Sequence, residues 1–152
     1  MTEDQSLADY MQGSDDFLKC LTICHDCTQL KISQKDGSDI TVLSGASLDE
    51  QCLLNQVQKD GIASFKSRTA KSVHIQIGGK DSSNTFDYDI LAVIEFTSER
   101  KIMSVVVKEK KTGQHYCYVK GAESQIMANL CPESAQSALK EKIEAEVYRF
   151  GG

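Results

Sequence analysis

The chain has 152 residues, a formal net charge of −5 and a hydrophobic fraction of 40%, which are ordinary values for one globular domain. A single proline and 10 glycines exclude a collagen-like or low-complexity chain, and the acidic balance argues against nucleic-acid binding. The longest apolar run, Ile90–Ile94, is far shorter than the roughly 20 residues of a membrane-spanning helix. These properties predict a flexible polar segment over residues 1–14 and one domain over residues 15–152.

Two helices with a β-hairpin between them are predicted in the first part of the chain. Four apolar residues are spaced as one helical face over residues 15–27, with Ser14 as a cap: Phe17, Leu18, Leu21 and Cys24. Asp36-Gly37 between the β-type runs 30–33 and 40–43 is typical of a hairpin turn. Ser47 followed by Glu50 fits a capping box, which predicts a helix that Gly61 ends.

A run of strands follows, and helices end the chain. The β-type segments are residues 62–68, 73–77, 86–96, 103–108 and 114–120. One helix is predicted over 123–130, ended by Pro132, and another over 134–148 with Ala138, Ile143 and Val147 on one side. Strands joined by short turns form antiparallel sheets, so the predicted fold is α+β, a twisted antiparallel sheet flanked by helices.

The six cysteines leave three interpretations open. They are Cys20, Cys24, Cys27, Cys52, Cys117 and Cys131. The chain shows no secretory signal, so we expect a reduced, intracellular protein. Cys24 and Cys27 form a CxxC, which suggests zinc or redox chemistry, but no second pair stands at zinc-ligand spacing. Because Cys20 and Cys24 fall in phase with the apolar helical face, packing in the core is the favoured interpretation.

Five short stretches resemble a known family in the same order. They are Leu21–His25, Ser47–Glu50, Gly61–Arg68, Phe96–Ser104 and Lys120–Ser124. Together they resemble the nucleotide-binding domain of P-type ATPases, specifically the phospholipid-flippase class. The resemblance covers most of the chain, and Lys-Gly-Ala with Phe-x-x-x-Arg-Lys-x-Met-Ser upstream is its most specific part. The chain departs from the flippase pattern at Leu48, Gln51-Cys52 and Ile102.

The resemblance implies an ATP site made of six residues: Glu50, Arg68, Phe96, Lys101, Lys120 and Gly121. Phe96 would stack on adenine, and Glu50 would accept a hydrogen bond from the adenine amino group. Lys120 would lie beside the purine and Lys101 nearer the phosphates. Gly121 would let the backbone approach the ligand closely.

Each of these residues also has a structural interpretation. Phe96 at a strand end could belong to the core, and Glu50 could serve only as the capping-box partner of Ser47. Lys101 could lie in a solvated turn and Gly121 in a turn before the next helix. Arg68 could be a surface cation or a partner of a nearby carboxylate.

The phosphorylated Asp-Lys-Thr-Gly motif of the P-type ATPases is missing from these residues. The similar string Lys110–Gly113 has lysine in place of the aspartate, and lysine cannot accept the phosphoryl group. The resemblance thus implies the cytoplasmic ATP-binding domain of a multi-pass membrane protein, monomeric by itself and without turnover. Its partners would be ATP, with magnesium held mainly elsewhere, and the phosphorylation and actuator domains.

Two other functions remain open from the sequence. One is a flippase-like module that has lost nucleotide binding and has a regulatory or scaffolding role in a larger membrane protein, such as a cyclase fusion. The other is a small zinc-binding module.

Overall fold

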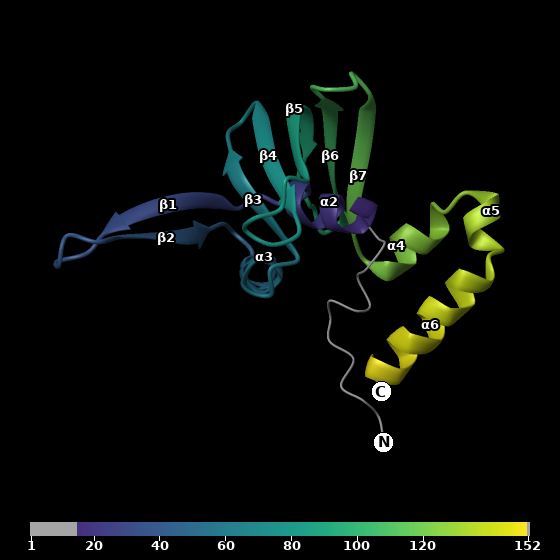
Figure 1. Cartoon of the computed structure of the whole chain (residues 1–152). Coiled ribbons are helices and arrows are strands. Elements are labelled where there is room, and N and C mark those ends of the chain that lie inside the picture. The colour runs from purple at the N-terminus through teal and green to yellow at the C-terminus, as the bar shows by residue number, and fades with distance from the viewer. Residues whose placement is uncertain (1–14, 152) are drawn as a thin grey trace.

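The computed structural model describes residues 15–151, so the predictions for residues 1–14 lie outside the described range. In chain order the elements are α2 (Asp15–Ile23), β1 (Thr28–Ser33), β2 (Asp39–Ser44), α3 (Leu48–Lys59), β3 (Ala63–Arg68), β4 (Ser72–Ile77), β5 (Thr85–Ile94), β6 (Ile102–Glu109), β7 (His115–Gly121), α4 (Glu123–Ala128), α5 (Pro132–Ala135) and α6 (Ala138–Gly151). Their arrangement is shown in Figure 1.

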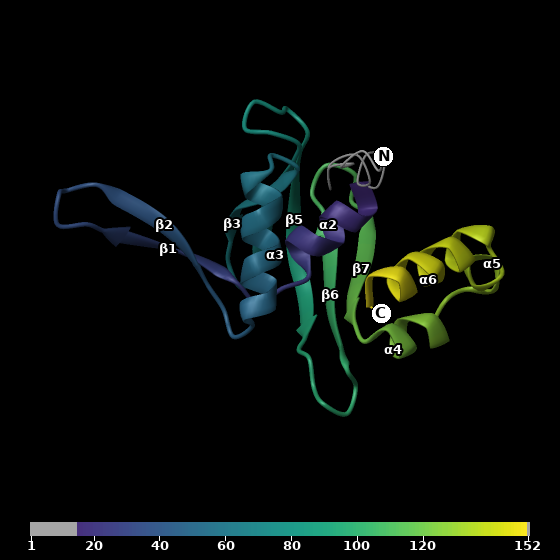
Figure 2. The same ribbon diagram turned by 90° about the horizontal axis from the view of Figure 1, so that it is seen from below.

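The main sheet has five strands in the order β3-β4-β5-β6-β7, and each strand pairs antiparallel with the next along the chain. Helices α2 and α3 lie against this sheet, and α4 to α6 follow beyond β7 (Figure 2). The predicted α+β class is therefore confirmed, and all five predicted strands are present.

The core lies between the sheet and the helices α2 and α3. Its fully buried side chains include Phe65, Ile75, Tyr88 and Val105 from the strands and Ile23 from α2. Burial of an apolar side chain of this size stabilises the fold by about 1.5–3 kcal/mol. This layer fixes where the ends of β5, β6 and β7 lie relative to α3.

The predicted hairpin forms a separate two-stranded ribbon, β1–β2, that extends away from the main sheet (Figure 1). Gly37 takes φ 83°, the left-handed conformation that the Asp-Gly turn requires. The ribbon joins the end of α2 to the start of α3, so it brings these two ends together.

The first helix is shorter than predicted, because α2 ends at Ile23 rather than at Cys27. Two side chains donate hydrogen bonds to the last carbonyl groups of α2. His25 Nε2 donates to Thr22 O at 2.8 Å, and Arg68 Nη1 donates to Ile23 O at 2.6 Å. The predicted face was also partly wrong, since Phe17 is exposed whereas Leu18 is buried.

The helix predicted over 134–148 is two helices, α5 and α6. Pro132, which we expected to end a helix, stands in the first turn of α5, where its missing N–H costs nothing. The break falls at Ser137, whose Oγ accepts a hydrogen bond from Lys140 N at 3.2 Å and so satisfies one free donor at the start of α6. No helix in residues 15–151 is long and apolar enough to cross a membrane.

Candidate functional site

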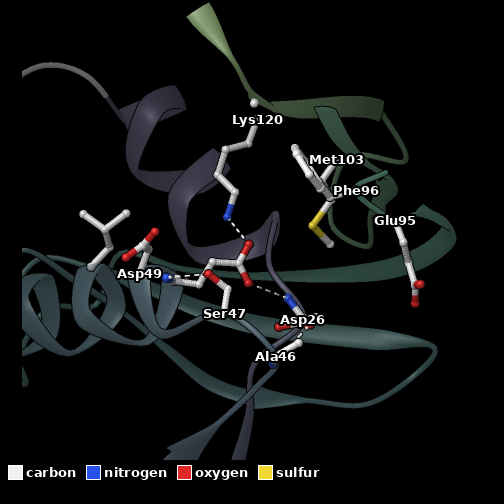
Figure 3. A pocket seen from close by; sticks show the side chains of 11 residues that line it. Asp26, Ala46, Ser47, Asp49, Glu95, Phe96, Met103 and Lys120 are labelled. Carbon is white, nitrogen blue, oxygen red and sulfur yellow. Dashed lines mark hydrogen bonds and ion pairs between the residues drawn. The ribbon is translucent and has the colours of Figure 1, made fainter. Parts of the chain in front are cut away.

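A pocket of about 800 Å³ lies between α3 and the ends of β5, β6 and β7 (Figure 3). Its lining residues are Asp26, Ala46, Ser47, Asp49, Glu50, Leu53, Glu95, Phe96, Met103, Lys120 and Gly121. Four of the six predicted site residues are therefore brought together here: Glu50, Phe96, Lys120 and Gly121. They come from α3, from the segment after β5 and from β7.

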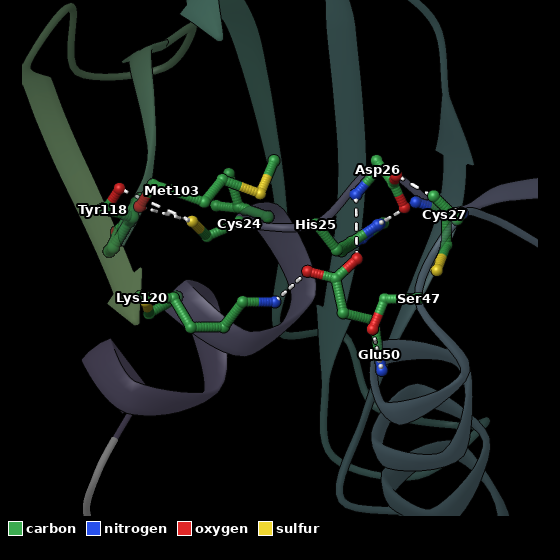
Figure 4. A network of polar contacts seen from close by, with 12 residues as sticks. Cys24, His25, Asp26, Cys27, Ser47, Glu50, Met103, Tyr118 and Lys120 are labelled. Atoms are coloured by element: carbon green, nitrogen blue, oxygen red, sulfur yellow. Dashed lines mark hydrogen bonds and ion pairs between the residues drawn. The ribbon is translucent and has the colours of Figure 1, made fainter. Parts of the chain in front are cut away.

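An ion pair between Glu50 Oε1 and Lys120 Nζ spans the pocket (Figure 4). The side chain of Glu50 is 13% exposed and that of Lys120 is 29% exposed, so water screens this pair only in part. The second oxygen of Glu50 accepts a hydrogen bond from Asp26 N at 3.3 Å. Glu50 thus links β7 to the chain segment that follows α2.

Only half of the predicted capping box forms. Ser47 is the N-cap of α3, and its Oγ accepts a hydrogen bond from Glu50 N at 3.3 Å. The Glu50 carboxylate does not return to Ser47 but faces Lys120. Ser47 therefore caps the helix, and the Glu50 side chain belongs to the pocket.

Phe96 supplies an apolar surface to the pocket. It lies just beyond the end of β5, and 57% of its surface is exposed, so it is not a core residue. Met103 on β6 also lines the pocket and is itself buried. An exposed ring together with a buried thioether offers an apolar site for an aromatic ligand.

Lys101 and Gly121 meet at the end of the β6–β7 pair. Lys101 has φ 57°, is exposed, and contributes its backbone carbonyl, which accepts a hydrogen bond from Ala122 N at 2.9 Å. Its side chain does not line the pocket. A Cβ on Gly121 would lie 2.3 Å from Lys101 O, so glycine is required for the close approach of these strands.

Arg68 does not line the pocket either. It is half-buried, and its hydrogen bond to Ile23 O ties β3 to the end of α2. Beside it, His25 is fully buried, and its Nδ1 accepts a hydrogen bond from Cys27 N at 3.0 Å. Burial, together with the nearby Arg68 cation, lowers the pKa of His25 to about 3, so its ring is neutral. These two side chains support the segment that carries Asp26.

The six cysteines are free thiols. The prediction of core packing is confirmed for Cys24 and Cys27, which are fully buried, and Cys20 packs partly against the same core. Cys24 Sγ donates to the carbonyls of Met103 and Tyr118 at 3.6 Å each. The pKa of Cys24 is raised first because its thiol donates a hydrogen bond to Cys20 and then by burial, so Cys24 is a poor redox nucleophile.

Several lining residues were not predicted from the sequence. Asp26 stands inside the Cys24–Cys27 CxxC but was not itself chosen, Glu95 is a single carboxylate with no motif around it, and Ala46, Leu53 and Met103 are ordinary apolar residues. Leu53 on α3 is half-exposed, and the sequence gives no sign that it lines a pocket.

The family follows from a comparison with known protein families. Residues 14–148 match the family described as P-type ATPase, cytoplasmic domain N. The chain therefore belongs to this family, as the resemblance implied.

Within the family, the chain is similar to phospholipid-transporting ATPases. It is 32% identical over 130 residues to phospholipid-transporting ATPase tat-1 of Caenorhabditis elegans, a match that covers 82% of this chain and 10% of that protein. It is 32% identical over 127 residues to phospholipid-transporting ATPase 2 of Arabidopsis thaliana, which covers 84% of this chain and 11% of that protein. Human phospholipid-transporting ATPase IK is 32% identical over 130 residues, 86% of this chain and 10% of that protein. The chain thus spans about a tenth of the length of these relatives.

Proposed function

We propose that this chain is the ATP-binding domain of a phospholipid-transporting P-type ATPase. The observation that carries the proposal is the convergence of Glu50, Phe96, Lys120 and Gly121 on one pocket. The pocket volume, about 800 Å³, falls within the range of about 300–1,000 Å³ that is usual for small-molecule sites.

The adenine ring would lie against Phe96, and its exocyclic amine would donate to Glu50. That hydrogen bond competes with the Lys120 ammonium for the same carboxylate, so binding exchanges one partner of Glu50 for another. A competition of this kind keeps the affinity modest, because the new hydrogen bond replaces an ion pair that the free protein already makes.

The phosphates would extend from the pocket toward Lys101, whose backbone carbonyl lies beside Gly121. The domain would then position the γ-phosphate for transfer to an aspartate in a separate phosphorylation domain, with Mg²⁺ held mainly by that domain. Catalysis in such a reaction consists mostly of positioning and charge stabilisation. In the complete membrane protein, the phosphorylation and actuator domains and the membrane-spanning part would couple hydrolysis to lipid movement. The isolated chain would be a monomer and would bind ATP without turnover.

Chemical-shift perturbation with ATP and with AMP tests the proposal. Both ligands should shift the amide resonances of Phe96, Lys120 and Glu50, since both carry adenine, and ATP alone should shift Lys101 strongly. Amides at the tip of the hairpin, around Gly37, serve as an internal reference that should not move.

Failure of both nucleotides to shift the pocket resonances at millimolar concentration would refute the proposal. It would favour the other function considered from the sequence, a flippase-like module that has lost nucleotide binding.

A further inference from the structure

Three different metal-binding side chains form a cluster, and two of them, Asp26 and Glu50, also line the pocket. One donor atom each from Asp26, Cys27 and Glu50 lies within 4.8 Å of the other two. Asp26 and Cys27 lie between α2 and β1, and Glu50 lies in the first turn of α3 (Figure 4). The β1–β2 ribbon brings these two segments together, so the cluster does not appear as a motif in the sequence.

Two observations mark the cluster as more than a group of carboxylates. The Cys27 side chain is fully buried, and its sulfur makes no hydrogen bond to any of the residues 15–151 that the structure describes. Gly45 packs closely against it, because a Cβ there would lie 2.8 Å from both Cys27 Sγ and Asp26 Oδ1. A buried sulfur and a carboxylate oxygen therefore lie together at a position where only glycine fits beside them.

We propose that Asp26, Cys27 and Glu50 form a binding site for a thiophilic divalent cation of the zinc type, and that this cation competes with adenine for Glu50. Sulfur with two carboxylates suits zinc, whereas Mg²⁺ and Ca²⁺ prefer oxygen ligands alone. Three protein ligands leave the fourth tetrahedral position to a water molecule from the pocket.

Only small movements are needed to form the site. Zinc holds sulfur at about 2.3 Å and carboxylate oxygen at about 2.0–2.2 Å, so donor pairs that are now up to 4.8 Å apart must close by roughly 1 Å. The Cys27 thiol loses its proton to solvent as the metal–sulfur bond forms. Glu50 already accepts from Lys120 through Oε1 and from Asp26 N through Oε2, so a metal on this carboxylate competes with these donors and is linked to the nucleotide pocket.

Cobalt(II) is a suitable probe, because cobalt bound to a thiolate absorbs in the near ultraviolet. We expect wild-type protein to develop this band with a stoichiometry of one cobalt per chain and to lose it when zinc is added. Cys27→Ser should abolish the band, whereas Cys52→Ser, which removes an exposed cysteine on α3, should keep it. No band in the wild type, or an equal band in Cys27→Ser, would overturn the site.

Two further variants separate loss of the site from loss of the fold. Gly45→Ala removes no ligand but places a methyl group 2.8 Å from both Cys27 Sγ and Asp26 Oδ1, which displaces these donors and should weaken cobalt binding, with circular dichroism to confirm folding. Lys120→Met frees Glu50 from its ion pair and should make cobalt binding severalfold tighter. A gain of affinity cannot come from unfolding, and weaker binding in Lys120→Met would contradict the role of Glu50.

Competition with adenine is measured with adenosine, which has no phosphates to chelate the metal. Saturating zinc should weaken adenosine binding, and by reciprocity adenosine should weaken zinc binding by the same factor. Unchanged adenosine affinity would overturn the shared use of Glu50. The cobalt band needs no nucleotide, so it remains informative if the proposed ATP binding fails.

Discussion

Replacement of Phe96 by alanine tests whether this side chain stacks on the ligand or stabilises the core. Less than half of Phe96 is covered, since 57% of it is exposed. Full burial of such a side chain is worth about 1.5–3 kcal/mol, so its partial burial contributes only about 1 kcal/mol to folding. Base–aromatic stacking is worth about 1–3 kcal/mol, which corresponds to a roughly 5- to 150-fold loss of affinity. Phe96→Ala should therefore weaken binding strongly while changing the free energy of unfolding little.

The assay is an NMR titration with ATP and AMP, paired with urea denaturation. The affinities for ATP and for AMP should fall by the same factor, because both nucleotides stack through adenine. Leu91→Ala is the matched control, since Leu91 is on the preceding strand β5 and is 53% exposed but lies outside the pocket. ATP affinity within twofold of wild type in Phe96→Ala, or destabilisation as large as that of a core truncation, about 3–5 kcal/mol, would refute the stacking role.

Three further predictions concern residues around the pocket. Arg68→Met should destabilise folding by about 1.5–3 kcal/mol in urea denaturation, because the hydrogen bond to Ile23 O is lost, yet change ATP affinity less than twofold; a large loss of affinity with unchanged stability would instead place Arg68 on the ligand. Lys101→Ala should weaken the binding of ATP but not of AMP in the NMR titration. An equal loss of affinity for both nucleotides would contradict a contact between Lys101 and the phosphates. The pKa of His25 is lowered to about 3, so the unfolded chain binds an extra proton below pH about 6.5, and the free energy of unfolding should fall by about 1.4 kcal/mol per pH unit from there toward pH 3. His25→Gln, measured with EDTA present, should remove this slope, and an unchanged slope would assign it to other groups.

Local chemistry made much of the fold predictable. The Asp-Gly turn, the alternation of the strands and the cap at Ser47 depend on neighbours in sequence, and all three are present in the structure. One error came in part from a contact between residues far apart in sequence. At the end of α2, the carbonyl of Ile23 is bound by Arg68, 45 residues away, and no local signal can reveal such a partner.

The candidate site was predictable only where a family pattern existed. Glu50, Phe96, Lys120 and Gly121 were chosen by resemblance, and they share a pocket. Asp26 stands in the CxxC, which does not indicate a pocket residue, and it meets Glu50 only because the β1–β2 ribbon brings the end of α2 to the start of α3. Lys101 and Arg68 stand in stretches that resemble the family, but neither lines the pocket.

The strand order has a consequence for how a ligand would act on the whole domain. Every strand of the main sheet pairs with its neighbour along the chain, so the sheet can assemble hairpin by hairpin with short loops to close. Glu50 and Lys120, in contrast, are separated by 70 positions and meet only when α3 docks. A ligand bound between Glu50 and Lys120 would stabilise the docked position of α3. Amide hydrogen exchange would therefore slow far more in α3 than in the strands.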